Sequence, residues 1–161
     1  MKTYIISALA YILFLGSSNP LLAQNNNLLS SYYGIKNALV AGDAAIASKQ
    51  AAAFSAALAA VDSKTLSAAE QTGFKSLQPK LASGSKAIAE TKDISKQREL
   101  FVSFSADMTG LAKGMKLSSQ SIYIDYCPMK KAYWLSAEQA IKNPYYGSSM
   151  LSCGSVKETL K

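Results

Sequence analysis

Apolar residues recur at intervals of three and four along four successive segments between residues 28 and 115. Such intervals place side chains on one face of an α-helix. The four sets are Leu28, Tyr32, Ile35 and Leu39; Ile46, Phe54, Leu58 and Val61; Phe74, Leu77, Leu81 and Ile88; and Phe101, Phe104, Met108, Leu111 and Met115. The last set keeps a heptad pattern, which favours core packing for Met108 and Met115 over metal binding. We therefore expect four amphipathic helices.

Short links separate these segments, and residues that cap helices precede each of them. The capping candidates are Asn27, Asp43, the Ser67–Glu70 capping box and Asp93. Gly42 is suited to ending the first helix. Pro79 lies inside the third segment, so we expect a kink or a break near Gln78. Amphipathic helices with short links predict an antiparallel up-and-down four-helix bundle.

After Ser118 the pattern changes from helical to alternating. Ile122, Ile124 and Tyr126 alternate with Tyr123, Asp125 and Cys127. This alternation predicts a strand, and residues 132–135 can return as its partner in a hairpin. A second capping box, Ser136–Gln139, predicts a short helix that Asn143-Pro144 ends. The predicted fold class is mainly α: a four-helix bundle with a small C-terminal β-hairpin and loop cap over about residues 119–161.

The first 23 residues have the layout of a secretory signal peptide. Lys2 gives a positive start, residues 4–15 form an almost unbroken apolar run, and Ala23 provides a small residue for cleavage. The run falls short of the ~20 residues that span a bilayer, and no cysteine near Ala23 could carry a lipid anchor. We expect a periplasmic protein without a membrane anchor, cleaved after about Ala23, with a single domain over residues 24–161.

The charge balance is basic but dispersed. The full chain has 17 basic and 10 acidic side chains, and Lys2 belongs to the leader, so the expected mature chain carries a net charge of +6. The longest basic run is Lys130-Lys131. Scattered lysines in an exported protein indicate a solvated surface, and we expect no nucleic-acid partner.

Two short motifs near the C-terminus place each cysteine close to a methionine, in a chain without histidine. Cys127 and Met129 flank Pro128, and a spacing of two on extended backbone sends both side chains to one side. Met150 and Cys153 are three apart, a spacing that brings side chains together on a helical turn. Two thiolates and two thioethers form a soft donor set, which favours Cu(I) or Ag(I).

A disulfide between Cys127 and Cys153 is the competing interpretation, because export places both thiols in an oxidising compartment. The protein would then be a metal-free, stapled interaction module. The flanking methionines favour the metal, since a structural disulfide does not need them. Enzymatic activity is not expected: without histidine there is no Ser-His or Cys-His pair, and the chain has no phosphate-binding glycine loop and no Cys-x-x-Cys pair.

The chain resembles a bacterial family of domains of unknown function, found as small exported proteins and fused to periplasmic adaptor subunits of copper/silver efflux pumps. The resemblance is carried by residues 126–129, 132–136, 143–147 and 150–154, and by residues 93–101 in the middle of the chain. It implies a helical bundle with a metal-associated C-terminal motif at Cys127, Met129, Met150 and Cys153. It also implies a role as a copper chaperone or efflux accessory, with an efflux adaptor or another metal-handling protein as partner.

Overall fold

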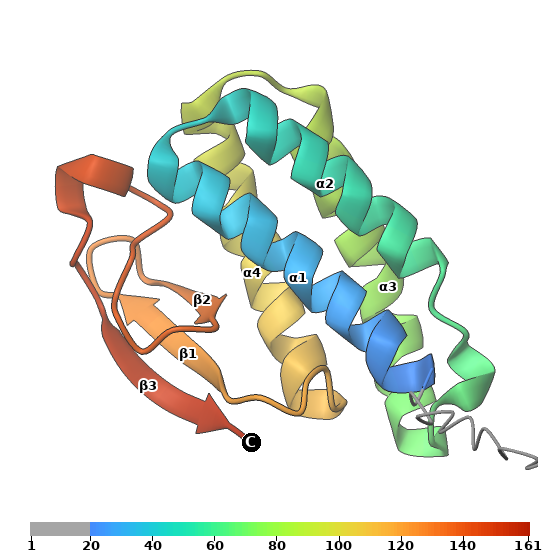
Figure 1. The fold of residues 1–161 in the computed structure, drawn as a ribbon. Helices are drawn as coiled ribbons and strands as arrows, with labels where there is room; N and C mark the ends of the chain where they lie inside the picture. Colours follow the sequence, from blue (N-terminus) through green and yellow to red (C-terminus); the bar gives the residue numbers. More distant parts are fainter. Residues whose placement is uncertain (1–19) are drawn as a thin grey trace, which may run out of the picture.

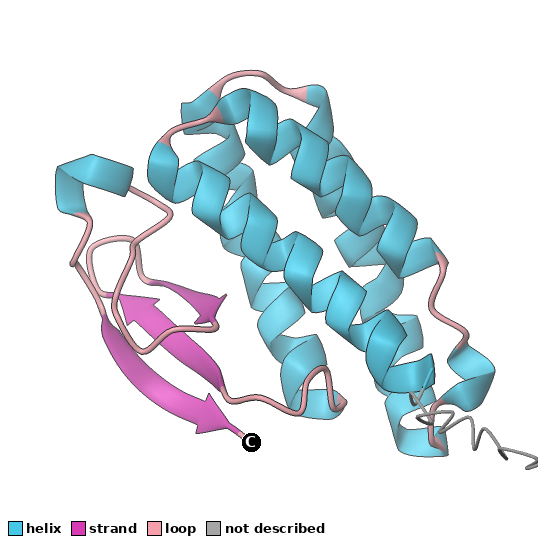
Figure 2. Cartoon of the chain, viewed as in Figure 1, coloured by secondary structure: helices cyan, strands magenta, loops and turns pink. Residues whose placement is uncertain are grey.

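The computed structural model describes residues 20–161, and residues 1–19, which hold most of the predicted signal peptide, lie outside the described part. The elements in chain order are α1 (Pro20–Ala41), α2 (Ala44–Ala59), the 3-10 turn η1 (Ser63–Thr65), α3 (Ala68–Glu90), α4 (Ile94–Gly114), β1 (Ile122–Cys127), β2 (Ala132–Ser136), the 3-10 turn η2 (Gly147–Met150) and β3 (Ser155–Leu160). The α-helices precede the strands along the chain, and the short turn η2 lies between β2 and β3 (Figure 2). The predicted mainly α fold with a C-terminal β cap is confirmed.

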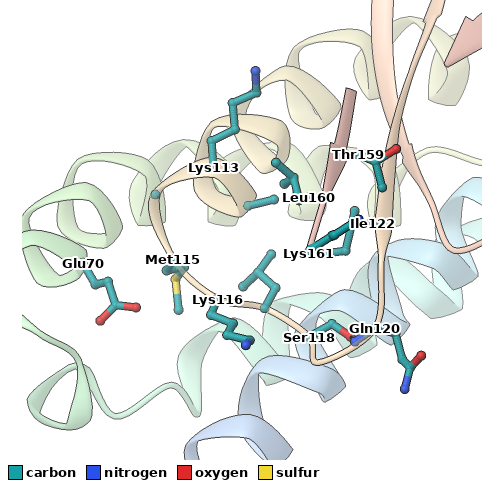
Figure 3. Close-up of a pocket in the computed structure, with 13 residues that line it drawn as sticks. Glu70, Lys113, Met115, Lys116, Ser118, Gln120, Ile122, Thr159, Leu160 and Lys161 are labelled. Atoms are coloured by element: carbon teal, nitrogen blue, oxygen red, sulfur yellow. The ribbon is translucent and has the colours of Figure 1, made fainter. Parts of the chain in front are cut away.

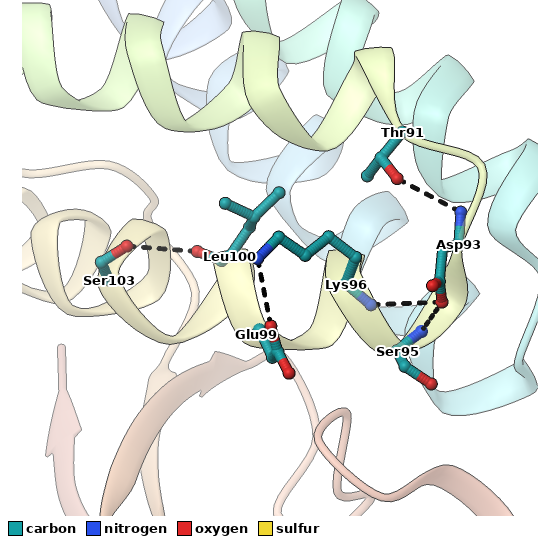
Figure 4. Close-up of polar contacts among 7 residues, drawn as sticks. All are labelled: Thr91, Asp93, Ser95, Lys96, Glu99, Leu100 and Ser103. Carbon is teal, nitrogen blue, oxygen red and sulfur yellow. Dashed lines mark hydrogen bonds and ion pairs between the residues drawn. The ribbon is translucent and has the colours of Figure 1, made fainter.

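Three of the four predicted helix starts are confirmed by their capping bonds. The Asp43 carboxylate accepts from the Ile46 N–H at 2.9 Å, and Ser67 and Glu70 complete a reciprocal capping box. At the start of α4 the Asp93 carboxylate accepts from the backbone N–H groups of Ser95 and Lys96 (Figure 4). These bonds satisfy donors that a helix start leaves without partners.

The first helix starts earlier than predicted. It begins at Pro20, so Asn27 lies inside α1 and caps nothing. Residues 20–23 belong to the predicted signal peptide, so the expected mature chain would begin inside this helix. Asn25, which is 2 % exposed, donates from its amide to the Lys116 carbonyl at 2.8 Å and so ties α1 to the segment that follows α4.

Consecutive helices pack against one another (Figure 1). The apolar sets predicted from the sequence largely form the core. Met108 and Met115 are buried, as the heptad pattern predicted. Ile46 is wrong as a core residue: it is 49 % exposed, and Ala47 and Ala51 fill the buried face of α2 instead. The small alanines let α2 approach its neighbours closely.

Pro79 does not interrupt the third helix. We expected a kink or a break near Gln78; α3 runs unbroken from Ala68 to Glu90, so the break does not occur. Pro79 and Lys75 are both exposed. The carbonyl that loses its partner to the proline therefore faces water, which can satisfy it, and the packed face is undisturbed.

A buried glutamine joins three helices at one end of the bundle. Gln97, on α4, is fully buried, and its side-chain nitrogen lies 3.0 Å from the Ala44 carbonyl and 2.9 Å from the Thr91 carbonyl. The same nitrogen lies 2.9 Å from the Ser48 hydroxyl. One amide therefore satisfies polar groups at the start of α2 and the end of α3.

The C-terminal cap is an antiparallel sheet with strand order β2-β1-β3. β1 and β2 pair in the predicted hairpin, with Cys127 opposite Ala132. β3 was not predicted, and it pairs with the other edge of β1. The short helix predicted from Ser136 does not form: Ser136 belongs to β2 and pairs with Tyr123, and bends follow it.

The sheet docks on the bundle through β2. The Leu135 N–H on the outer edge of β2 donates to the Tyr32 hydroxyl of α1 at 3.0 Å, and that hydroxyl lies 2.5 Å from the Ser105 hydroxyl of α4. Tyr145 packs against Trp134 and Phe101, with ring centroids 5.9 Å apart in both pairs. Both contacts fix the position of the cap, and with it the position of the sulfur motifs.

Candidate metal centre

The sheet brings the two cysteines together. Cys127 is the last residue of β1, and Cys153 stands two residues before β3. Because Tyr126 pairs with Ser155, the residues just beyond that pair meet at the same end of the sheet. The two sulfur atoms are 3.6 Å apart, and both residues are free thiols, Cys127 buried and Cys153 half-buried.

Gly154 permits this close approach. Its φ is +152°, and a Cβ added there would lie 2.7 Å from Cη2 of Trp134 and 3.0 Å from the Tyr126 carbonyl oxygen. Real Cβ atoms do not come that close to their neighbours. The backbone at residue 154 can therefore pass this close to the Trp134 indole and the end of β1 only because glycine has no side chain.

Asn143 bonds to the backbone of the second cysteine. The residue is fully buried, and its side-chain amide donates to the Cys153 carbonyl at 2.7 Å. Its side-chain oxygen accepts from the Tyr145 N–H at 2.8 Å. Its backbone N–H donates to the Leu151 carbonyl, also at 2.8 Å. The segment that carries Met150 and Cys153 is thus closed into a loop on Asn143.

The surroundings of the thiol pair favour a thiolate at Cys127. Burial alone would raise the pKa of the Cys127 thiol, but hydrogen bonds to its sulfur outweigh burial and hold that pKa below its ordinary value. The donors are the backbone N–H groups of Lys130 and Met129, the side chain of Asn143 and the Cys153 thiol. The bond to Cys127, followed by burial, raises the pKa of Cys153. Cys127 therefore loses its proton first, and the remaining proton is shared with Cys153.

The two thioethers lie close to the thiols along the chain but differ in exposure. Met129 is in the turn after β1 and is 64 % exposed, so its side chain reaches largely into solvent. Met150 ends η2 and is half-buried, and its carbonyl accepts from the Cys153 N–H at 3.1 Å. The structure thus brings the two cysteines together, while Met129 and Met150 lie two and three residues from a cysteine along the chain.

The described part of the chain has no cluster of side chains that would suit a harder metal ion. No group of three or more His, Cys, Asp or Glu side chains gathers anywhere in residues 20–161. No helix in the same range is long and apolar enough to cross a membrane.

A surface hollow of about 450 Å³ lies elsewhere, between the end of α4 and β3 (Figure 3). It is lined by the lysines 113, 116 and 161 and by Glu70 and Met115, among others. Its lysines are exposed, and Lys113 pairs with Glu158 at 2.5 Å. The C-terminal end of α4, which repels anions, also borders it. This hollow is therefore a weaker candidate for a binding site than the thiol pair.

Comparison with protein families gives one assignment. The model of a family described as a protein of unknown function, DUF3347, matches residues 28–120. The chain belongs to the DUF3347 family. The match covers most of α1, the other three helices and the link to β1, and it includes residues 93–101, on which part of the resemblance rested. Cys127, Met129, Met150 and Cys153 lie beyond it, so the DUF3347 match carries no information about the sulfur motifs. Comparisons with curated proteins and with solved structures gave no match.

Sequence reasoning missed two residues that shape the site of this DUF3347 protein. The sequence predicts no positioning role for Asn143, although an asparagine before proline also favours a turn in which its side chain bonds the nearby backbone. Gly154 follows Cys153 directly, and glycine beside a functional residue signals close backbone approach. β3 escaped prediction because all six of its residues are at least partly exposed, which leaves little apolar alternation.

Proposed function

We propose that the protein binds a soft monovalent metal ion, Cu(I) or Ag(I), through Cys127 and Cys153, with Met129 and Met150 as thioether ligands. The observation that supports this most directly is the pair of unbridged sulfurs 3.6 Å apart. The proposed role is that of a binding protein rather than an enzyme.

The separation of the sulfurs suits a shared metal ion. If each metal–sulfur bond is about 2.3 Å, as in zinc–thiolate sites, an ion touching both sulfurs would have an S–metal–S angle of about 100°. A linear two-coordinate site would need the sulfurs roughly 1 Å farther apart. The present spacing therefore favours three or four donors, which gives Met129 and Met150 a place in the site.

The chemistry of the donors selects the ion. Thioethers and thiolates are soft and favour Cu(I), whereas Zn(II) usually takes more thiolate or an imidazole. The chain supplies no imidazole at all. The N–H donors around Cys127 already favour its thiolate, the form that binds metal.

The proposed biological role is to carry or buffer the metal in the periplasm as a chaperone or an accessory to heavy-metal efflux. An efflux adaptor or another metal-handling protein would be the partner. Three features support this proposal: the signal-peptide pattern of residues 1–23, the sulfur motifs, and the resemblance to proteins associated with copper and silver efflux.

A disulfide-stapled, metal-free module is the second candidate, and the same short distance favours it. A disulfide needs the sulfurs at about 2.05 Å, so a closure of roughly 1.5 Å would join them. In the chain-entropy model, closing a loop of this length stabilises the fold by about 3.5 kcal/mol. Metal and disulfide exclude one another, because both use the same two sulfurs.

The test is titration of the fully reduced protein with Cu(I) against a competing chromogenic chelator. The parent is expected to take up one equivalent. Cys127→Ser and Cys153→Ser should each lower the affinity more than about 100-fold, beyond the usual effect of losing an outer contact. Met129→Leu and Met150→Leu should each cause a smaller loss.

Met115→Leu is the matched control, because Met115 is a buried core methionine at the end of α4. It should bind Cu(I) like the parent. Parent-like binding in Cys127→Ser or Cys153→Ser would refute the proposed site. Counting thiols in protein taken directly from the periplasm addresses the second candidate: two free thiols would exclude the staple.

A further inference from the structure

Asn143 contacts the backbone at two points within the segment from Met150 to Cys153. Its amide reaches the Cys153 carbonyl at 2.7 Å, and its backbone N–H reaches the Leu151 carbonyl at 2.8 Å. The same side chain also helps to hold the pKa of the Cys127 thiol below its ordinary value. An asparagine amide has two N–H groups, so it can serve both cysteines at once.

The remaining polar atoms of Asn143 are also in use. The side-chain oxygen accepts from the Tyr145 N–H, and the backbone carbonyl accepts from the Gly147 N–H at 3.1 Å. Tyr145 is itself fixed, because its hydroxyl donates to the Tyr133 carbonyl of β2 and its ring packs on Trp134. The orientation of the carboxamide is therefore set by the cap rather than by the cysteines.

We propose that Asn143 is the positioning residue of the thiol pair, holding Cys127 and Cys153 at chelating distance before any ion arrives. A site ordered in advance loses less conformational freedom on binding and so gains affinity. The metal-binding part of this inference rests on the function proposed above; the positioning of the thiols does not.

Positioning can be measured without metal from the equilibrium with glutathione. Two cysteine thiols and one oxidised glutathione give the intramolecular disulfide and two reduced glutathiones, so the equilibrium constant reports how well the thiols are held together. Asn143→Ala removes every side-chain contact. Asn143→Asp keeps the size and the oxygen that accepts from Tyr145 but loses both N–H donors. Each variant should lower this constant by about tenfold, the effect of one lost hydrogen bond of about 1.4 kcal/mol, and lower the Cu(I) affinity likewise.

Asn25→Ala is the matched control. Asn25 is an equally buried asparagine whose amide also donates to a backbone carbonyl, at 2.8 Å, but it ties α1 to Lys116 and not to a cysteine. It should lower the thermal stability and leave both equilibria unchanged. If the Asn143 variants match the parent in the glutathione equilibrium, or if Asn25→Ala shifts it equally, the positioning role is wrong. If the glutathione constant falls but the parent binds no Cu(I), the proposed metal function fails and the positioning role stands.

Discussion

Gly154→Ala is expected to separate the two thiols and to lower the free energy of unfolding by about 2–5 kcal/mol. The added Cβ would lie 2.7 Å from the Trp134 ring and 3.0 Å from the Tyr126 carbonyl, and the backbone there has a φ of +152°. Trp134 is fully buried, so the ring cannot move aside without disturbing the cap. The backbone at residue 154 must therefore shift instead, and Cys153, the adjacent residue, would shift with it. Urea unfolding and the glutathione equilibrium of the thiols measure the two effects.

Gly73→Ala is the control for this change. Gly73 lies inside α3, and a Cβ there would meet nothing within 4 Å. Alanine should therefore stabilise the helix by about 0.5–1 kcal/mol and leave the thiols as they are. A Gly154→Ala protein with the stability and the thiol equilibrium of the parent would show that the indole contact does not position Cys153.

Asp125→Asn is expected to stabilise the reduced, metal-free protein by about 3 kcal/mol at pH 7 and by little at pH 4. Asp125 lies on β1 and is fully buried, and neither carboxylate oxygen has a hydrogen-bond partner. Burial raises the pKa of this carboxyl to about 6, and the nearby Lys36, itself buried, lowers it only in part. The folded protein therefore keeps the proton on the Asp125 carboxyl to a higher pH than the unfolded chain does.

The direction of the pH dependence follows from proton binding. Between the ordinary pKa of 3.8 and about 6, the folded state retains a proton that the unfolded chain has lost. The stability of the parent should therefore fall as the pH rises through this window, and asparagine should remove this loss. Urea unfolding of both proteins from pH 4 to pH 8 makes the comparison. Parallel stability curves for the two proteins would show that Asp125 is not desolvated in the fold.

The helical part of the fold could be predicted because its signals are local. The caps at Asp43, Ser67 and Asp93 and the heptad pattern of α4 depend on residues a few positions apart. The exceptions also have local causes. Ile46 was assigned to the core by its apolarity, yet alanines pack closer at that face, and Pro79 is harmless because it faces water.

The site was predictable only in part because its geometry depends on pairing between distant segments. Residue types and spacing identified Cys127 and Cys153 as partners, but their 3.6 Å separation results from the β1–β3 pairing, and β3 has no clear apolar alternation. The roles of Asn143 and Gly154 depend on which carbonyl and which ring the folded chain brings near them. No sequence interval encodes those contacts.

X-ray absorption at the copper edge of the reduced, Cu(I)-loaded protein tests the central claim most directly. If Cys127 and Cys153 bind the ion together with the thioethers, the copper should have only sulfur neighbours, three or four of them, at about 2.3 Å. Cys127→Ser should lose at least one of these sulfurs. Nitrogen or oxygen neighbours in place of sulfur, or a parent protein that retains no copper after desalting, would contradict the soft-metal site.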